Sequence, residues 1–216
     1  MPKSPKKKTA RQKKKPKPEP QGKLIALEGM RGPDLTENAA RLVDQLNRGS
    51  ALAGYSRWDA SNTFYELRLR KAKRFSPPPR TLLLLYASDL LFRLRWEIKP
   101  ALLEGHTVVA APYVETAIGF GTALGLSKDW LQELFSFAPK ADVALRLKEK
   151  AKFKPKQKKS KASEGFVEFC CDTLSAGSAD WSAPEVWAGT LRYLDALEEN
   201  DSLQRLGKKL PKTVRR

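Results

Sequence analysis

The apolar pattern of the chain begins with a short run from Leu24 to Leu27, followed by a Gly-containing turn at 29–33. Beyond the turn, apolar residues recur at helical spacing, at Ala39, Leu42, Val43 and Leu46. A short continuous apolar run is typical of a buried strand, and spacings of three and four residues are typical of an amphipathic helix. This first stretch therefore predicts a strand, a tight turn and a helix in that order.

The same alternation of short apolar runs and longer periodic stretches continues along the chain. Three further strands are predicted, at 52–55, 107–111 and 142–147. Further helices are predicted at about 62–73, 81–103, 114–124, 128–137, 164–174 and 183–199. Strands that alternate with helices favour a parallel sheet covered on both faces. The predicted fold is an α/β three-layer sandwich with a central parallel sheet of about five strands flanked by helices.

The net charge of +17 is concentrated in three basic segments. Residues 1–22 carry +8, residues 148–161 carry +7 and residues 205–216 carry +6, which leaves −4 for the remainder. The first segment is rich in Lys and Pro and has no apolar periodicity, so it is predicted to be a disordered basic tail. Such tails either bind nucleic acid or another polyanion through its phosphates, or serve only to keep a protein in solution.

These composition shifts divide the chain. The disordered tail at 1–22 precedes one domain at 23–206, which carries a Lys-rich, lid-like insertion at 148–163. A second basic tail follows at 207–216.

Several classes of protein are excluded by composition. Cys170 and Cys171 are the only cysteines and His106 is the only histidine, so neither a disulfide framework nor a multi-ligand metal site is predicted. No apolar stretch approaches the roughly 20 residues that span a bilayer, and the first residues lack the apolar segment of a secretory signal. We therefore expect a soluble protein in the cytoplasm, with no metal site and no membrane contact.

The turn after the first strand resembles a phosphate-binding loop, G-x-x-x-x-G-K-[ST], of the P-loop NTPases. Counted from Gly29, the positions of the motif's second Gly, its Lys and its hydroxyl residue hold Asp34, Leu35 and Thr36. Leu35 carries no charge and Asp34 repels phosphate, so the loop is degenerate. Its candidate phosphate-binding residues are Gly29, Arg31, Gly32 and Thr36. The alternative is a plain helix start, with Asp34 favoured by the helix dipole.

Four motifs in order lead to a family resemblance. They read Glu28-Gly29, Arg57-Trp58-Asp59-Ala60-Ser61, Leu83-Leu84-Leu85-Tyr86-Ala87-Ser88-Asp89-Leu90 and Ala111-Pro112-Tyr113. In order and spacing they resemble the motifs of thymidylate kinases, which transfer a phosphoryl group from ATP to dTMP. The resemblance covers about residues 23–147. It implies the P-loop NTPase fold and, if activity is retained, ATP and Mg²⁺ as cofactors.

The resemblance also implies roles for single residues. Arg57 would hold the monophosphate and Tyr86 would stack on the base, with Asp89 and Tyr113 as further nucleotide-binding candidates. The Lys-rich insertion lies where the family has its mobile lid. The lid candidates are Lys148, Lys150, Lys152 and Lys154.

Three cations of the family pattern are replaced. Leu35 stands for the loop lysine, Leu90 for a nucleotide-binding arginine, and Ala111-Pro112 for the Asp-Arg of the family's "DRY". Because phosphoryl transfer depends on positioning and on stabilising charged oxygens, these losses predict impaired catalysis.

Three functions remain open at this point. The first is a catalytically impaired, thymidylate kinase-like module, or pseudokinase, that binds a nucleotide or a partner. The second is an active dTMP kinase in which Arg31 and lid lysines replace the lost cations. The third is a nucleic-acid- or polyanion-binding protein that uses its basic tails. The resemblance also implies a possible homodimer.

Overall fold

The computed structural model describes residues 22–49, 51–69, 77–149, 152, 165–175, 182–200 and 204–205. The predicted basic tails lie outside the described residues, apart from Gly22, and so does most of the Lys-rich insertion at 148–163.

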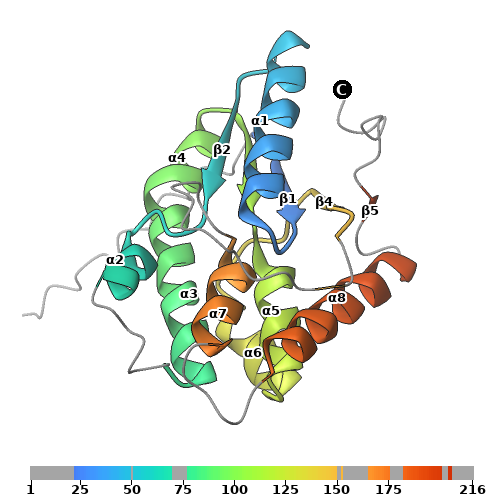
Figure 1. Ribbon diagram of the computed structural model, residues 1–216. Helices are drawn as coiled ribbons and strands as arrows, with labels where there is room; N and C mark the ends of the chain where they lie inside the picture. Colours follow the sequence, from blue (N-terminus) through green and yellow to red (C-terminus); the bar gives the residue numbers. More distant parts are fainter. Residues whose placement is uncertain are drawn as a thin grey trace, which may run out of the picture.

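A parallel sheet forms the centre of the fold (Figure 1). Its body has four strands in the order β2-β3-β1-β4, all of them parallel, and a short fifth strand at the β4 edge brings the sheet to about the number that the sequence predicts. A two-residue segment, β5, pairs with β4 at the edge and has no apolar run that a sequence pattern could detect. The strands are β1 (Leu24–Glu28), β2 (Ala53–Arg57), β3 (Thr107–Ala111), β4 (Val143–Arg146) and β5 (Gln204–Arg205).

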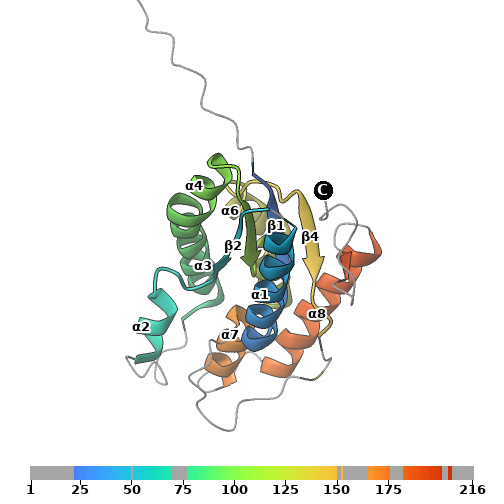
Figure 2. The same ribbon diagram turned by 90° about the horizontal axis from the view of Figure 1, so that it is seen from above.

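Helices cover both faces of the sheet, as the α/β prediction requires (Figure 2). One face packs against α1 (Gly32–Arg48), where Ile25 and Leu27 contact the apolar stripe of that helix. The opposite side chains of the same strands, such as Leu24 and Ala26, belong to a second cluster with the remaining helices. These helices are α2 (Thr63–Leu69), α3 (Pro79–Arg93), α4 (Lys99–Leu103), α5 (Val114–Ala123), α6 (Lys128–Leu134), α7 (Phe166–Ser175) and α8 (Ala183–Glu199). The arrangement is that of a P-loop NTPase-like sandwich.

The long helix predicted at 81–103 is present but contains a π-helical turn, η2 (Leu94–Ile98), between α3 and α4. Pro100 follows this turn and has no N–H to donate to the carbonyl four residues earlier. A wider turn before the proline accommodates that missing hydrogen bond. Gly105 ends the helix with φ +84°, a conformation that residues with a Cβ rarely adopt.

The sheet and its helices bring the carboxyl ends of β1, β2 and β3 to one edge. Ligands of open parallel α/β sheets bind at this edge. Among the described residues, no helix combines the length and apolar character needed to cross a bilayer.

Candidate functional site

The candidate phosphate loop connects β1 to α1 and is short. Only Gly29, Met30 and Arg31 separate the strand from α1, which begins at Gly32. In a working phosphate loop the eight-residue motif lies between strand and helix. Here the second half of that motif, including Asp34 and Thr36, is already part of α1.

The loop amides bind a carboxylate of the chain itself. Met30 and Arg31 donate their backbone N–H groups to the same oxygen of Glu149, over 2.8 and 3.3 Å. Burial raises the pKa of Glu149, and the two amide hydrogen bonds oppose that rise. Arg31 is also the N-cap residue of α1, and its own side chain makes no capping hydrogen bond to any described residue. A carboxylate from a remote segment thus satisfies donors that a cap would normally satisfy.

A second carboxylate completes the arrangement from α7. Gly32 donates its N–H to Oε2 of Glu168 over 3.1 Å, and Gly165 donates to the same oxygen over 3.3 Å. Gly165 lies so close to the loop that a Cβ there would be 2.3 Å from the carbonyl oxygen of Met30. Backbone approach at this position therefore requires glycine, and it brings the start of α7 directly over the loop.

Glu28, at the end of β1, fixes the opposite side of the loop. Its carboxylate is fully buried and accepts hydrogen bonds from the backbone N–H groups of Tyr113, Glu115 and Thr116 and from the Thr116 hydroxyl. Thr116 in turn accepts the N–H of Gly29 over 3.2 Å. Burial raises the pKa of Glu28 to about 7 despite these hydrogen bonds, which favour the charged form. The Glu28 carboxylate therefore binds the backbone at the start of α5.

Arg31, the predicted phosphate-binding cation of the loop, is partly exposed and lies near a carboxylate. The guanidinium of Arg31 lies 3.8 Å from the Asp34 carboxylate, and both side chains are partly exposed. Leu35 points into the core between α1 and the sheet. The loop therefore presents a partly neutralised arginine where a phosphate would need a fixed positive charge.

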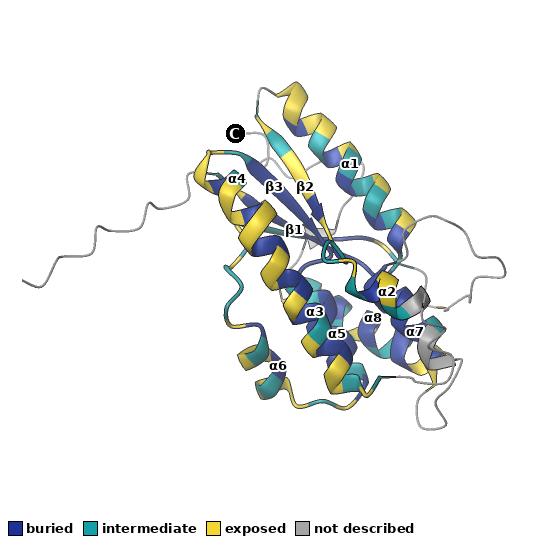
Figure 3. Cartoon of the chain, turned by 90° about the vertical axis from the view of Figure 1, so that its left-hand side faces the viewer, coloured by how far each residue is buried: buried dark blue, intermediate teal, exposed yellow. Residues whose placement is uncertain are grey.

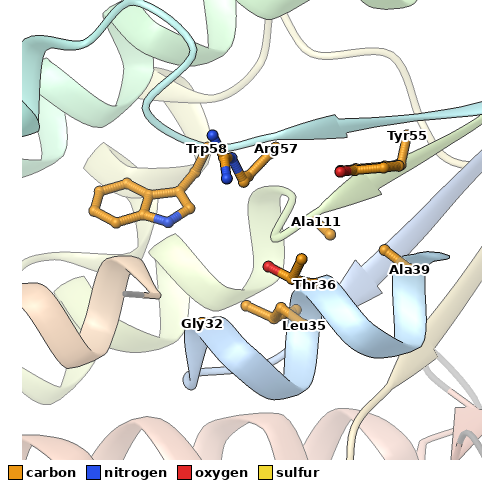
Figure 4. A pocket seen from close by; sticks show the side chains of 8 residues that line it. All are labelled: Gly32, Leu35, Thr36, Ala39, Tyr55, Arg57, Trp58 and Ala111. Carbon is orange, nitrogen blue, oxygen red and sulfur yellow. The ribbon is translucent and has the colours of Figure 1, made fainter. Parts of the chain in front are cut away.

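Arg57 and Thr36 line the same cavity, which is very small. Both line a cavity of about 10 Å³ between β2 and α1, with Trp58 and Gly32 at its edge (Figure 4). That volume is about what one water molecule needs, whereas ligand pockets are usually several hundred Å³. Arg57 itself is exposed at the end of β2.

Tyr86 and Asp89 lie in the interior of the protein. Tyr86 is 0% exposed, and its hydroxyl donates to the carbonyl oxygens of Pro112 and Tyr113. Asp89 is also buried and accepts hydrogen bonds from the backbone of Asp59 and from both the N–H and the hydroxyl of Ser61. These two predicted nucleotide-binding residues hold the turn after β2 and the end of β3 in place.

Aromatic rings occupy the space beside Tyr86. The ring centroid of Phe166, from α7, lies 4.4 Å from that of Tyr86. Phe166 also contacts Trp58 and Phe64 at 5.8 and 5.7 Å. A base could stack on Tyr86 only if α7 moved away.

Of the remaining candidates, Tyr113 lies in the interior and the described lid lysines lie at the surface. Tyr113 is buried and donates its hydroxyl to the carbonyl oxygen of Pro139. Lys148 and Lys152 are exposed, and Lys150 and Lys154 lie outside the described residues.

Sequence reasoning missed one buried cation near the site. Arg93, fully buried in α3, donates to the hydroxyl and the carbonyl of Ser56 and to the carbonyl of Pro112. It lies one turn beyond Leu90, the position of the lost arginine, but its donors serve the backbone at the ends of β2 and β3. Its place among the apolar residues Leu90, Leu91, Phe92 and Leu94 was the signal that could have identified it.

The donor set fits ATP and Mg²⁺ poorly. The amides of residues 30–32 already bind carboxylates, and Ala111 supplies no oxygen ligand from its side chain. Among the described residues, no group of three or more His, Cys, Asp or Glu side chains could hold a metal ion. A cavity of about 620 Å³ does lie on the α5 face of β1 and β4, but three acids, Glu28, Glu115 and Asp142, line it against a single cation, Lys140, and disfavour a phosphate.

Three comparisons with curated proteins agree with the motif resemblance. A probable thymidylate kinase of Pyrobaculum aerophilum is 28% identical over 124 residues, which is 57% of this chain and 63% of the relative. A probable thymidylate kinase of Staphylothermus marinus is 29% identical over 126 residues, 58% of this chain and 63% of the relative. A thymidylate kinase of Xanthomonas oryzae pv. oryzae is 34% identical over 136 residues, 59% of this chain and 56% of the relative.

No protein-family model matches the chain. The chain spans about three fifths of the length of the curated relatives it matches. By these similarities and by its fold, the chain is similar to thymidylate kinases over somewhat more than half of its length.

Proposed function

We propose that this protein is a diverged thymidylate kinase-like module in which phosphoryl transfer is impaired and which acts by binding a partner rather than a nucleotide. The observation that carries the proposal is the cavity beside Arg57 and Thr36, where the resemblance puts the acceptor phosphate. Its volume is about 10 Å³, too small for a nucleoside monophosphate.

The charges of the site support the same proposal. Phosphoryl transfer needs preorganised positive groups around the moving phosphoryl group, and loss of one such group typically slows catalysis by about 10²–10³-fold. Leu35, Leu90 and Ala111 are core residues here and supply no charge. Arg31 forms an ion pair with Asp34, and Arg93 donates hydrogen bonds to backbone carbonyls.

Calorimetric titration of the full chain with dTMP, dTDP and ATP tests the proposal. We expect weak binding or none for each nucleotide, and the Arg57→Ala variant should behave like the unaltered protein. Binding of dTMP with a micromolar dissociation constant that Arg57→Ala abolishes would show an open acceptor site and contradict the proposal.

An active dTMP kinase is the second candidate, favoured by the names of the relatives. In that case α7 must move from Tyr86, and Arg31 must leave Asp34 to bind phosphate. A coupled assay with ATP and a panel of nucleoside monophosphates tests it. Turnover that Arg31→Ala abolishes would establish this candidate in place of the first.

An exposed apolar stripe supports homodimerisation, which the resemblance also implies. These exposed apolar residues lie on α3, η2 and α4, a region where exposed positions are prominent (Figure 3). The members of the stripe are Leu84, Leu91, Phe92, Trp96 and Leu103. We propose that a second copy of the chain covers it, because contiguous exposed apolar patches mark interaction sites. Light scattering should give a dimer that Trp96→Asp dissociates; a monomer at all concentrations would contradict this.

Two proposals rest on the sequence alone. The basic tail at 1–22 would bind nucleic acid or another polyanion, and salt-sensitive binding that is lost on deleting it is the test. A cytoplasmic location fits the two cysteines, which are free and buried.

A further inference from the structure

Two carboxylates from distant parts of the chain meet on three consecutive backbone positions. Glu149 follows β4 and Glu168 lies in α7, and they are 119 and 136 residues away from the amides they bind. Together they accept the N–H groups of Met30, Arg31 and Gly32. We call Glu149 and Glu168 the carboxylate plug.

The position of the carboxylate plug is the one an anion would take. The amides at the start of a helix are unsatisfied and carry partial positive charge from the helix dipole. With 17 residues, α1 is long enough for the dipole to develop fully. A carboxylate presents two negatively charged oxygens, as the edge of a phosphate group does, so each plug residue stands where a phosphate oxygen could bind.

The fit of Glu149 is incomplete. Its Oε1 accepts two amides, but its Oε2 is buried and has no hydrogen-bond partner among the described residues. Leaving a charged oxygen buried and unpaired is unfavourable. The nearby Asp34 carboxylate adds repulsion and, together with burial, raises the pKa of Glu149. Glu149 is therefore held less favourably on these amides than a carboxylate whose two oxygens are both hydrogen-bonded.

We propose that the carboxylate plug is an autoinhibitory contact: Glu149 and Glu168 occupy loop amides that remain able to bind a phosphate-type anion. This inference rests on the proposed function, since it explains how a degenerate loop keeps its anion-binding backbone without binding polyphosphate. It adds a regulatory element to the impaired site. Loss of the plug restores anion binding but not catalysis, because the missing cations stay missing.

Pyrophosphate titration of ¹⁵N-labelled full chain tests the proposal, with the amide signals of Met30, Arg31 and Gly32 as the readout. The plug variant is Glu149→Ala/Glu168→Ala. The matched control is Glu133→Ala/Glu199→Ala, which removes the same charge from two exposed acids. Circular dichroism and a thermal melt confirm that each protein is folded.

We expect the unaltered protein and the control to show no saturable shifts. The plug variant should bind pyrophosphate at least about tenfold more tightly, with each single variant between the two. Saturable shifts in the unaltered protein would overturn the proposal, because the amides would then be accessible. A folded plug variant that does not bind would also overturn it and would show that the carboxylates serve only as helix caps.

A second pair of variants decides the question if the alanine variant does not fold. Glu149→Gln/Glu168→Gln keeps an accepting oxygen and the side-chain volume but removes both charges. It should gain part of the pyrophosphate affinity, and no gain would overturn the proposal. The proposed function fails separately: dTDP formation by the unaltered protein contradicts it whatever the plug variants do.

Discussion

On the phosphate-loop side of the site, residues 29–32 are covered by the carboxylates of Glu149 and Glu168. On the acceptor side, the space around Tyr86 is filled by the aromatic rings of Phe166 and Phe135. The first side is closed by hydrogen bonds to charged groups that water or another anion could replace. The second is closed by apolar packing, which no polar ligand can replace without exposing the rings to water.

The comparison separates two ways of losing a binding site. A polar closure preserves the donors underneath, so removing a side chain can restore binding. An apolar closure makes the former site part of the core, so removing a side chain weakens the fold and creates a cavity. Both sides of the site depend on α7, because this helix supplies Glu168 to the phosphate-loop side and Phe166 to the acceptor side.

The largest expected effect is on the acceptor side. Phe166→Ala should lower the free energy of unfolding by about 3–5 kcal/mol, because it removes a fully buried ring with several aromatic neighbours. Urea unfolding followed by circular dichroism measures the loss. Tyr65→Ala is the control, since Tyr65 is 55% exposed and lies outside the proposed dimer contact, and it should change stability by less than about 0.5 kcal/mol. A Phe166→Ala protein of normal stability would mean that the acceptor side is not closed by packing.

The next largest effect is the pH dependence of stability that Glu28 causes. Glu28 is linked to the loop through Thr116, which accepts the N–H of Gly29. Its folded pKa of about 7 lies above the ordinary value of 4.5, so the folded state binds the proton more tightly. The stability from this group is present below the ordinary pKa and is lost as the pH rises through about 7. Between pH 5 and pH 8 the loss should be on the order of 2–3 kcal/mol.

Glu28→Gln cannot titrate and should remove this part of the pH dependence. Urea unfolding at a series of pH values, for both proteins, gives the comparison. The raised pKa of Glu149 contributes a slope of the same sign in both. Equal slopes in the two proteins would show that Glu28 is charged at neutral pH and that burial does not dominate its pKa.

A smaller effect is expected on the phosphate-loop side. Glu168→Ala should destabilise the protein by about 1–2 kcal/mol, the usual loss when a helix N-terminus loses its cap. The loss should be smaller than that of Phe166→Ala although both residues lie in α7. Thermal unfolding of the two variants side by side tests the order, and the reverse order would remove the distinction between the two closures.

The smallest effect is expected for Arg57. It is exposed, and Arg57→Ala should change the free energy of unfolding by less than about 0.5 kcal/mol. Chemical unfolding at neutral pH measures it. A much larger loss would give Arg57 a structural role that its exposed position does not indicate.

The layout of strands and helices could be predicted because it follows from local apolar periodicity. The strand at Leu24 and the helix after it are examples, since both are defined by residues a few positions apart. The fifth strand could not be located, because two residues at an edge carry no periodic signal.

The state of the site depended on contacts that are distant in sequence. Glu149 lies within a run of lysines, a pattern typical of a solvent-exposed segment, yet it accepts the backbone N–H groups of Met30 and Arg31, 119 and 118 residues away. It is the only acid in residues 148–161, and that exception was the available signal. The burial of Tyr86 depends on Phe166 in another helix, and no motif reports such packing.

Direct measurement of dTDP formed from dTMP and ATP tests the central claim, with the Xanthomonas oryzae thymidylate kinase as a positive control. We expect a rate at least about 10³-fold below that of the control, since Leu35, Leu90 and Ala111 supply no fixed positive charge. A rate within about tenfold of the control, equivalent to about 1.4 kcal/mol of barrier, would contradict it.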